Sequence, residues 1–282
     1  MRRFGLICFA ALAVALGLSS CLEDNGNVWT DEDVVTRSVK EVVDGVSVLE
    51  NGLFSMVYPK NWDCEFSSED SMGVEDIRLR GSGLSITINI MPFNFTMGKK
   101  MDEIMRQEFF EGGSLQKKRV TIDGIEGIVY AGEDNDIRMC FFRNGNKTVG
   151  ILINYHIDTD AEFKLEEYLT WKAGSNEQTS WIEEAKGLSD AITRSLQNDG
   201  LLHAFVKLIP EESLFVFRSE SFDGYFSREE AEEKLAKIVG VFSAVKSCAE
   251  HGFTFLVENV DEKGNMIGSH SFTPEDYNEW LE

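Results

Sequence analysis

The segment Leu84-Ser85-Ile86-Thr87-Ile88-Asn89-Ile90-Met91 gives the clearest sign of the architecture, because apolar and polar side chains alternate along it as far as Ile90. Successive side chains of a β-strand point to opposite faces of the sheet, so the three isoleucines share one face while Thr87 and Asn89 share the other. Residues 151–155 repeat this alternation. We therefore expect two long strands in a sheet that buries one of its faces.

Short turn sequences join pairs of such segments, which predicts a series of hairpins. The expected pairs are Val46–Glu50 with Leu53–Tyr58, Ile77–Arg80 with Leu84–Met91, Lys118–Ile122 with Ile125–Tyr130, and Ile137–Phe142 with Thr148–His156. The first pair is joined by Asn51-Gly52, which suits a type I′ turn. Short connections make neighbouring strands antiparallel, so the sheet is expected to be antiparallel.

Helices are expected to flank this sheet. Lys99–Phe110 carries apolar residues at helical spacing and is followed by two glycines. Trp181–Leu196 begins after Ser180-x-x-Glu183, a capping-box pattern. A further helix from Thr30 through Asp44 rests on valines at helical spacing, although β-branched residues favour strands. Helices packed on an antiparallel sheet make an α+β fold.

A second unit is expected over 201–282, after Asp199-Gly200. Its elements are strands at Leu201–Ile209 and Leu214–Phe217, one long helix from Ser227-x-x-Glu230 to Gly252, a hairpin of Phe253–Val260 with Met266–Phe272, and a short helix starting at Thr273-Pro274. This ββαββα order suffices for a small sandwich of its own. The same strands also suit an extension of the first sheet.

The N-terminus indicates export. Met1-Arg2-Arg3 is followed by the uncharged apolar run 4–18, which is too short to span a bilayer but suits a signal peptide. Leu18-Ser19-Ser20-Cys21 resembles the lipobox of bacterial lipoproteins. The resemblance implies that 1–20 is removed, that Cys21 is lipidated, and that 21–45 is a tether with a possible helix. An ordinary secretory signal and an uncleaved anchor are the alternatives.

The lipobox resemblance also implies an address in the cell envelope. Leu22-Glu23 after the cysteine does not resemble the aspartate-type signal for retention in the inner membrane. The outer membrane is therefore favoured if the host has one. A lipid anchor would make the membrane itself a partner of the chain.

A second resemblance covers about residues 46–198. Phe54-Ser55-Met56-Val57-Tyr58-Pro59-Lys60-Asn61-Trp62, the segments 120–124 and 127–130, and the helix Trp181–Leu196 resemble, in pattern and order, PsbP-like domains. The resemblance implies an α/β/α sandwich that is usually non-enzymatic, such as an extrinsic subunit, an adaptor or an envelope lipoprotein. Residues 157–180 depart from a minimal version of the pattern, and no functional residue carries over.

The net charge limits the kinds of partner the chain can bind, and the number of cysteines limits its disulfide bonds. The chain has 49 acidic and 27 basic residues, a formal net charge of −22, so nucleic acid is not expected as a partner. An anionic membrane surface would repel such a body, so attachment should depend on lipid. Beyond the signal and Cys21, three cysteines remain and allow at most one internal disulfide. We expect Cys64 in a loop, Cys140 in a strand and Cys248 in a helix, with at least two of them buried free thiols.

The sequence contains no nucleophile elbow, phosphate-binding loop, dinucleotide fingerprint or zinc-protease motif. His156 is expected at an exposed strand end, His203 within an apolar strand, His251 at a helix C-terminus, and His270 in a hairpin without an evident partner. We assign no catalytic, cofactor-binding or metal-ligating residue, and Cys21 is the one modification site.

Three weaker patterns resemble catalytic or metal-binding motifs. Ser243-x-x-Lys246 matches the serine–lysine motif of penicillin-binding proteins, but its companion motifs are missing and an exposed helix surface explains it. The acidic segments 133–136 and 158–162 were weighed as calcium loops, and neither carries a full set of oxygen ligands.

The leading hypothesis is therefore a membrane-tethered envelope lipoprotein that acts as a non-catalytic module binding a protein or a ligand. One alternative is a hydrolase that uses acidic residues, which predicts a pocket with convergent carboxylates or a histidine. Another is a carrier of a small ligand or sugar, which predicts an apolar cleft lined by Trp62, Trp171 or Trp181.

Overall fold

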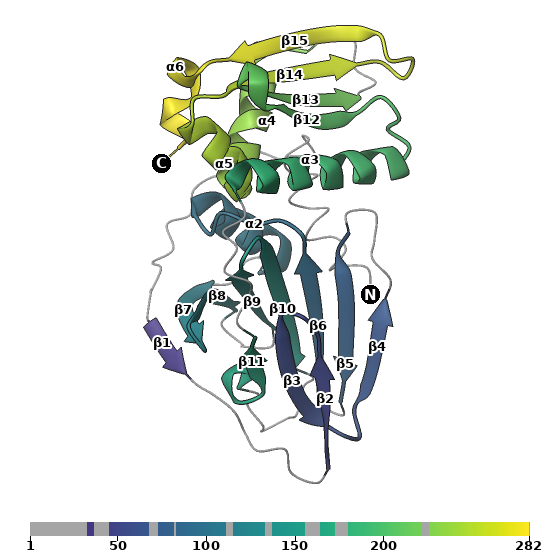
Figure 1. The fold of residues 1–282 in the computed structure, drawn as a ribbon, viewed down its shortest axis with the longest axis vertical. Coiled ribbons are helices and arrows are strands. Elements are labelled where there is room, and N and C mark those ends of the chain that lie inside the picture. Colours follow the sequence, from purple (N-terminus) through teal and green to yellow (C-terminus); the bar gives the residue numbers. More distant parts are fainter. Residues whose placement is uncertain are drawn as a thin grey trace.

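The protein is an α+β protein whose sheets are mostly antiparallel (Figure 1). The computed structural model describes residues 33–36, 45–67, 73–81, 83–110, 115–132, 137–155, 164–172, 180–220 and 226–281. In Figure 1 an eight-stranded and a three-stranded sheet form the lower body, and a four-stranded sheet lies above them. Two helices, α2 (Lys99–Phe109) and α3 (Trp181–Asn198), lie between these parts.

The eight-stranded sheet has the order β1-β7-β8-β9-β10-β6-β5-β4. Its strands are β1 (Asp33–Thr36), β4 (Asp63–Ser67), β5 (Glu75–Arg80), β6 (Leu84–Met91), β7 (Gln116–Ile122), β8 (Ile125–Ala131), β9 (Ile137–Asn144) and β10 (Lys147–Tyr155). Neighbours are antiparallel except β1 and β7. Ile88 pairs with Ile151 and both are fully buried, which confirms the alternation that predicts this sheet.

The three-stranded sheet covers the apolar face of the larger one. It consists of β2 (Val46–Glu50), β3 (Phe54–Pro59) and β11 (Leu169–Trp171), in the order β11-β3-β2. Phe54 packs edge-on against Trp171 with 5.8 Å between ring centroids, and both belong to one buried cluster with Ile86 and Ile88. Burial of these side chains away from water is the main force that holds the two sheets together.

The C-terminal sheet has the order β12-β13-β14-β15 and is mixed. The C-terminal part consists of β12 (Phe205–Ile209), β13 (Leu214–Glu220), α4 (Arg228–Val241), α5 (Ser243–Glu250), β14 (Thr254–Val260), β15 (Met266–Phe272) and α6 (Pro274–Tyr277), with short 3-10 helices at Pro210–Glu212 and Asn278–Trp280. A further 3-10 helix, Leu165–Glu167, precedes β11 in the lower body. Strands β13 and β14 are parallel, because the chain crosses from one to the other through α4 and α5. These strands make a sheet of their own and do not extend the first one.

Helix α3 packs against the C-terminal sheet. The Thr193 hydroxyl accepts from the Val206 amide at 2.8 Å and donates to the Val206 carbonyl at 2.9 Å. The capping box expected at Ser180 and Glu183 is present. The apolar side of α3, including Leu188 and Ile192, lies in one buried cluster with residues of α4, α5 and β13. A helix expected to follow the first sheet therefore covers one side of the second.

Three local expectations were wrong. Residues 33–36, expected within a helix from Thr30 to Asp44, form a strand, and the rest of that segment lies outside the described residues. Cys64, expected in a loop, lies in β4. The hairpin of β2 and β3 is confirmed, but its turn is not type I′, because neither Asn51 nor Gly52 has a positive φ. The Asn51 side-chain oxygen instead accepts hydrogen bonds from the backbone amides of Leu53 and Phe54, at the start of β3.

The long helix expected from Ser227 to Gly252 is broken at Phe242. This residue has extended backbone angles, φ −97° and ψ 119°, and forms an isolated bridge with Phe95. The Thr96 amide donates to the Val241 carbonyl at 2.7 Å, and the Ser243 amide donates to the Asn94 carbonyl at 3.1 Å. A segment of the lower body therefore replaces helical hydrogen bonds at this point and joins the two halves of the molecule.

Candidate functional site

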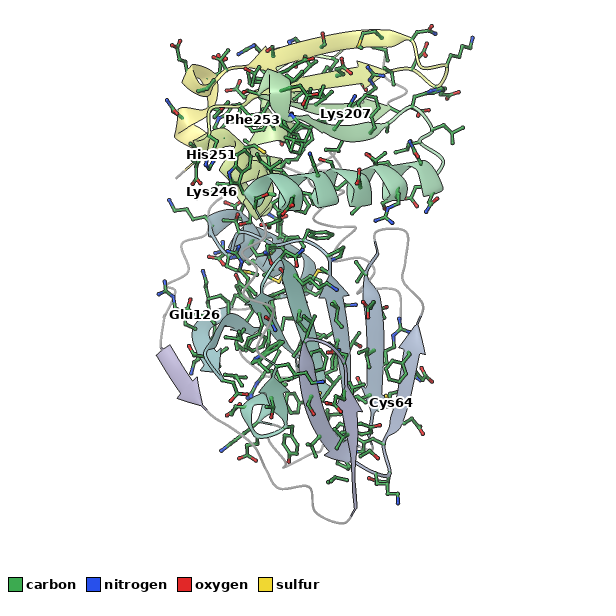
Figure 2. All side chains as sticks on the ribbon, viewed as in Figure 1. Cys64, Glu126, Lys207, Lys246, His251 and Phe253 are labelled. Atoms are coloured by element: carbon green, nitrogen blue, oxygen red, sulfur yellow. The ribbon has the colours of Figure 1, made fainter. Side chains whose placement is uncertain are left out.

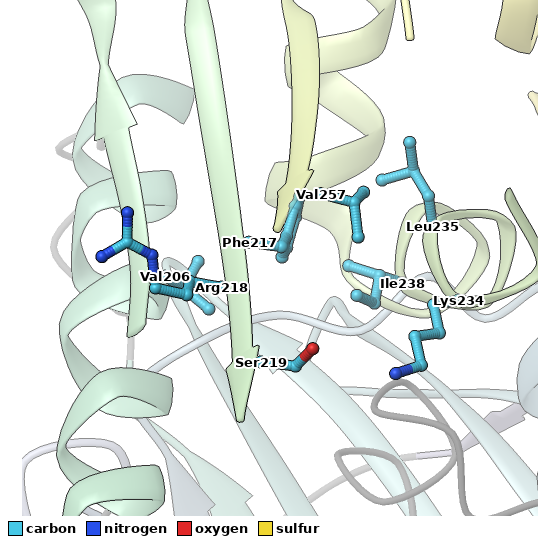
Figure 3. A pocket seen from close by; sticks show the side chains of 8 residues that line it. All are labelled: Val206, Phe217, Arg218, Ser219, Lys234, Leu235, Ile238 and Val257. Carbon is cyan, nitrogen blue, oxygen red and sulfur yellow. The ribbon is translucent and has the colours of Figure 1, made fainter. Parts of the chain in front are cut away.

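The candidate site is a crevice beneath the C-terminal sheet, at the carboxyl ends of its two parallel strands (Figure 3). Open sheets that combine parallel strands with crossing helices commonly bind ligands at such ends. Strands β12, β13 and β14 and helix α4 provide the walls, which consist of Val206, Phe217, Arg218, Ser219, Lys234, Leu235, Ile238 and Val257. The cavity volume is about 10 Å³, which is room for about one water molecule.

Lys234 brings a charge to this largely apolar crevice. Its side chain is half-buried on α4, and its amine lies 5.4 Å from the centroid of the Phe226 ring. Burial lowers the pKa of the Lys234 amine, because a charged ammonium loses part of its hydration there, while the negative charges of Glu230 and Glu233 act in the opposite direction. Lysines in such environments are often functional.

The two acidic residues whose charges act on Lys234 bind other groups. Glu230 accepts a hydrogen bond from the Ser227 amide at 2.9 Å, as part of the capping box that begins α4. Glu233 forms an ion pair with Lys237 at 2.5 Å. In the ranges that the structure describes, no hydrogen bond or ion pair joins Lys234 to a carboxylate. Glu230 and Glu233 therefore act on the ammonium group through their charge, but neither forms a direct ion pair or hydrogen bond with it.

Ser219 supplies a hydroxyl to the same crevice. It comes from β13, opposite Lys234 on α4, as Figure 3 shows. The hydroxyl donates to the buried Asn259 side chain at 3.1 Å and lies 3.3 Å from the carbonyl oxygen of Glu258. Because its proton is used in this way, the Ser219 oxygen is oriented and keeps its capacity to accept a hydrogen bond.

Arg218, a second cation near the crevice, has both an ion-pair partner and an aromatic contact. Its guanidinium contacts the Glu258 carboxylate at 2.6 Å and lies over the Phe205 ring, 4.4 Å from the centroid. Side chains alternate along β13, so Arg218 points away from the face that carries Ser219. Arg218 therefore borders the crevice through its place on β13, while its guanidinium is paired with Glu258, and Lys234 is the lining cation without such a pair.

The described histidines lie apart from one another. His203 precedes β12 in a turn, contrary to the expectation of a strand, and its amide donates to the Glu220 carboxylate at 3.0 Å. His251 ends α5, as expected, and stacks on Trp181 with 4.3 Å between centroids. The Nε2–H of His270 donates to the Phe226 carbonyl at 3.0 Å, close to the crevice. His156 lies outside the described residues.

The other sequence candidates are also dispersed. The Ser243 hydroxyl accepts from Arg143 at 3.3 Å, and Lys246 lies one turn further along α5 (Figure 2). The acidic segments 133–136 and 158–162 lie outside the described residues, as does Cys21. Among the residues that the structure does describe, no group of three histidine, cysteine or acidic side chains is placed to hold a metal ion.

The three cysteines beyond the N-terminal segment are free. Cys140 and Cys248 are buried in β9 and α5, which confirms the expectation of at least two buried thiols. Burial raises the pKa of each of these two thiols to about 12, so both are held in the protonated form. Cys64 is half-buried on the outer strand β4 (Figure 2).

The tryptophans expected in a carrier do not share a cleft. Trp171 is buried between the two sheets of the lower body, where it contacts Phe142. Trp62 packs at the edge of the same core, beneath Gly81. Trp181 stacks on His251 at the junction of the halves. Each tryptophan ring therefore packs in a different part of the molecule.

Comparisons of the chain with protein-family models, with curated proteins and with solved structures find no match. Of the helices in the described ranges, none has both the length and the apolar character needed to cross a bilayer.

Proposed function

We propose that the chain is an exported lipoprotein, held at the cell envelope through Cys21, that acts as a non-catalytic binding module. The PsbP-like domain of this proposal covers residues 46–198, with its last helix, α3, packed against the C-terminal sheet in place of the expected α/β/α sandwich. The small C-terminal unit carries the binding crevice. The observation that carries the proposal is the half-buried Lys234 ammonium, which lies near the carboxyl ends of parallel strands and forms no ion pair or hydrogen bond with a carboxylate in the described ranges.

The sequence supports the envelope address. The basic start, the apolar run 4–18 and Leu18-Ser19-Ser20-Cys21 occur in the order that export and lipidation require. The net charge of −22 would keep the folded body away from an anionic membrane surface, so a covalent lipid at Cys21 is the attachment that fits. An acidic body of this kind also favours partners that are not nucleic acids.

Footprinting of Lys234 tests the binding role. The detergent-solubilised full chain is treated with trace acetic anhydride, with and without an extract of the cell envelope, and acylation is measured by mass spectrometry. We expect the extract to lower acylation of Lys234 about fivefold or more relative to Lys237, which pairs with Glu233 on the same helix. Equal acylation of both lysines with and without the extract would contradict the proposal.

The address has a separate test. Mass spectrometry of the N-terminal peptide from the membrane fraction should give a chain that starts at Cys21 and carries acyl groups. A Cys21→Ser variant should leave the membrane fraction. A mature chain with Met1 still attached, or with an unmodified thiol at Cys21, would show that the lipoprotein assignment is wrong.

A further inference from the structure

We infer that the crevice binds a carboxylate on a short apolar chain, with the Lys234 ammonium as its counter-charge and the Ser219 hydroxyl as a polar neighbour. This inference rests on the proposed binding function and names its ligand class. It begins from the distribution of charge. The chain has 49 acidic residues, yet Glu230 and Glu233, whose charges act on Lys234, bind the Ser227 amide and Lys237.

A bound anion would remove the main electrostatic cost of the crevice. An ammonium group that loses hydration without gaining a partner is costly, and an opposite charge within a few ångströms offsets that cost. The cation–ring contact with Phe226 supplies only part of the lost interaction, because such contacts are weaker than a charge-assisted hydrogen bond. A ligand with one negative charge therefore completes the site.

The available donors favour a carboxylate over a phosphate. A phosphate usually binds to several backbone amides at a helix N-terminus or to clustered arginines. At the start of α4 the Ser227 hydroxyl accepts from the Glu230 amide at 3.1 Å, and the carboxylate of Glu230 occupies the same turn. Arg218 is paired with Glu258. One ammonium group suits a monoanion.

The walls determine the rest of the ligand. Val206, Phe217, Leu235, Ile238 and Val257 present hydrocarbon to the cavity. With a cavity volume of about 10 Å³, which is room for about one water molecule, even a methyl or a methylene group enters only as these side chains move apart. A short aliphatic acid fits this description, and so does the carboxylate of a peptide that ends in a small residue.

The experiment uses sodium propionate as the probe and propionamide as its neutral analogue of the same shape. The full chain carries ¹³C-labelled lysine, and the Lys234 side-chain signal is followed by NMR at constant ionic strength. We expect propionate to shift this signal with an affinity in the millimolar range, about tenfold or more tighter than propionamide. The affinity should fall as the pH rises through the lowered pKa of Lys234, because the neutral amine no longer attracts the anion.

Matched variants assign the contacts. Lys234→Met should weaken propionate binding about tenfold or more, and Ser219→Ala should weaken it less. Lys186→Met, which removes an exposed charge from α3, should leave it within about twofold of the unsubstituted chain. If a variant does not fold, the NMR signal of Lys234 in the unsubstituted chain still shows whether propionate binds beside this residue. Equal binding of propionamide, tighter binding of inorganic phosphate, or full affinity in Lys234→Met would overturn the inference.

A second arm separates the two sources of the carboxylate. The tripeptide Gly-Gly-Ala is compared as the free acid and as the C-terminal amide, next to propionate. Tighter binding of the free peptide acid than of propionate assigns the site to a chain terminus, and the reverse assigns it to a small acid. If the envelope extract protects Lys234 but no carboxylate binds, the ligand class is wrong and the proposed binding function remains supported. No protection and no binding would contradict both.

Discussion

Two lysines lie between a helix and a sheet in the two halves of the molecule, Lys117 on a strand and Lys234 on a helix, and they differ in their ion pairs. Lys117 on β7 forms an ion pair with Asp102 of α2 at 3.1 Å, and each side chain is 12% exposed. Tyr130 on β8 donates to the other oxygen of Asp102 at 2.6 Å. Lys234 in the upper half has a comparable setting between helix and sheet, but its acidic neighbours bind other groups.

This difference separates a structural charge from a candidate binding charge. A buried ion pair is kept when each partner gains hydrogen bonds that replace hydration, which describes Asp102 with Lys117 and Tyr130. A half-buried ammonium without such partners reduces the stability of the fold, and it is retained where it serves another purpose. Loss of the first lysine should therefore harm the fold, whereas loss of the second should not.

The largest expected effect follows from removing the structural lysine. Lys117→Met leaves the Asp102 carboxylate buried without its cation, and we expect the free energy of unfolding to fall by about 3 to 5 kcal/mol. Urea denaturation followed by circular dichroism measures this loss. The double variant Lys117→Met with Asp102→Asn should recover part of it. A loss below about 1 kcal/mol would show that the pair does not hold α2 on the sheet.

A smaller effect is expected from the hydroxyl that completes this pair. Tyr130→Phe removes one hydrogen bond to Asp102 and keeps the buried ring, so the expected loss is about 1 to 2 kcal/mol. The same denaturation experiment measures it. An unchanged stability would indicate that the Asp102 oxygen finds another donor, and the comparison of the two lysines would lose one of its supports.

The charge of Glu230 tests how strongly α4 itself acts on Lys234. Ser227→Ala removes the hydroxyl that caps α4 and should cost about 1 kcal/mol, but it keeps the Ser227 amide to which the Glu230 carboxylate is bound. The pKa of Lys234, measured by NMR titration, should therefore stay unchanged in this variant. Glu230→Gln removes a negative charge one helical turn away and should lower that pKa further. An unchanged pKa in Glu230→Gln would contradict the role given to Glu230.

The smallest effect, of opposite sign, is expected at Lys234 itself. Lys234→Met should raise the free energy of unfolding at neutral pH by about 1 kcal/mol, because an apolar side chain of similar length replaces a poorly hydrated charge. The native state has the lowered pKa, so between that pKa and the ordinary value the unfolded chain binds more protons. The stability of the unsubstituted chain therefore rises with pH in this window, and the advantage of the variant should vanish near pH 10.5.

Local sequence rules predicted most hairpins and helices, because each depends on residues close together in the chain. Asp123-Gly124 has positive φ at both residues, 49° and 81°, as a tight hairpin turn requires. The capping boxes at Ser180 and Ser227 were likewise evident. The errors came where distant segments meet. Phe242 leaves the helix because Phe95 pairs with it, and residues 33–36 form a strand because β7 offers a free edge.

The candidate site was not predictable for a related reason. Helical spacing places Glu230 four residues before Lys234, which indicates an ordinary ion pair on a helix surface. Only the three-dimensional arrangement shows that Glu230 caps the helix and that β13 and β14 are parallel. The parallel pairing depends on contacts between residues about 40 positions apart, such as Phe215 with Phe255. No pattern of neighbouring residues predicts this parallel pairing.

The most direct test of this account is the titration of Lys234 in the unliganded full chain, followed through the ¹³C signal of its side chain. A pKa clearly below the ordinary lysine value of 10.5 is the expected result, and it should move upward when propionate is added. A pKa at or above 10.5 without any ligand would mean that the ammonium already has a counter-charge within the chain. The crevice would then have no charge left to offer a ligand.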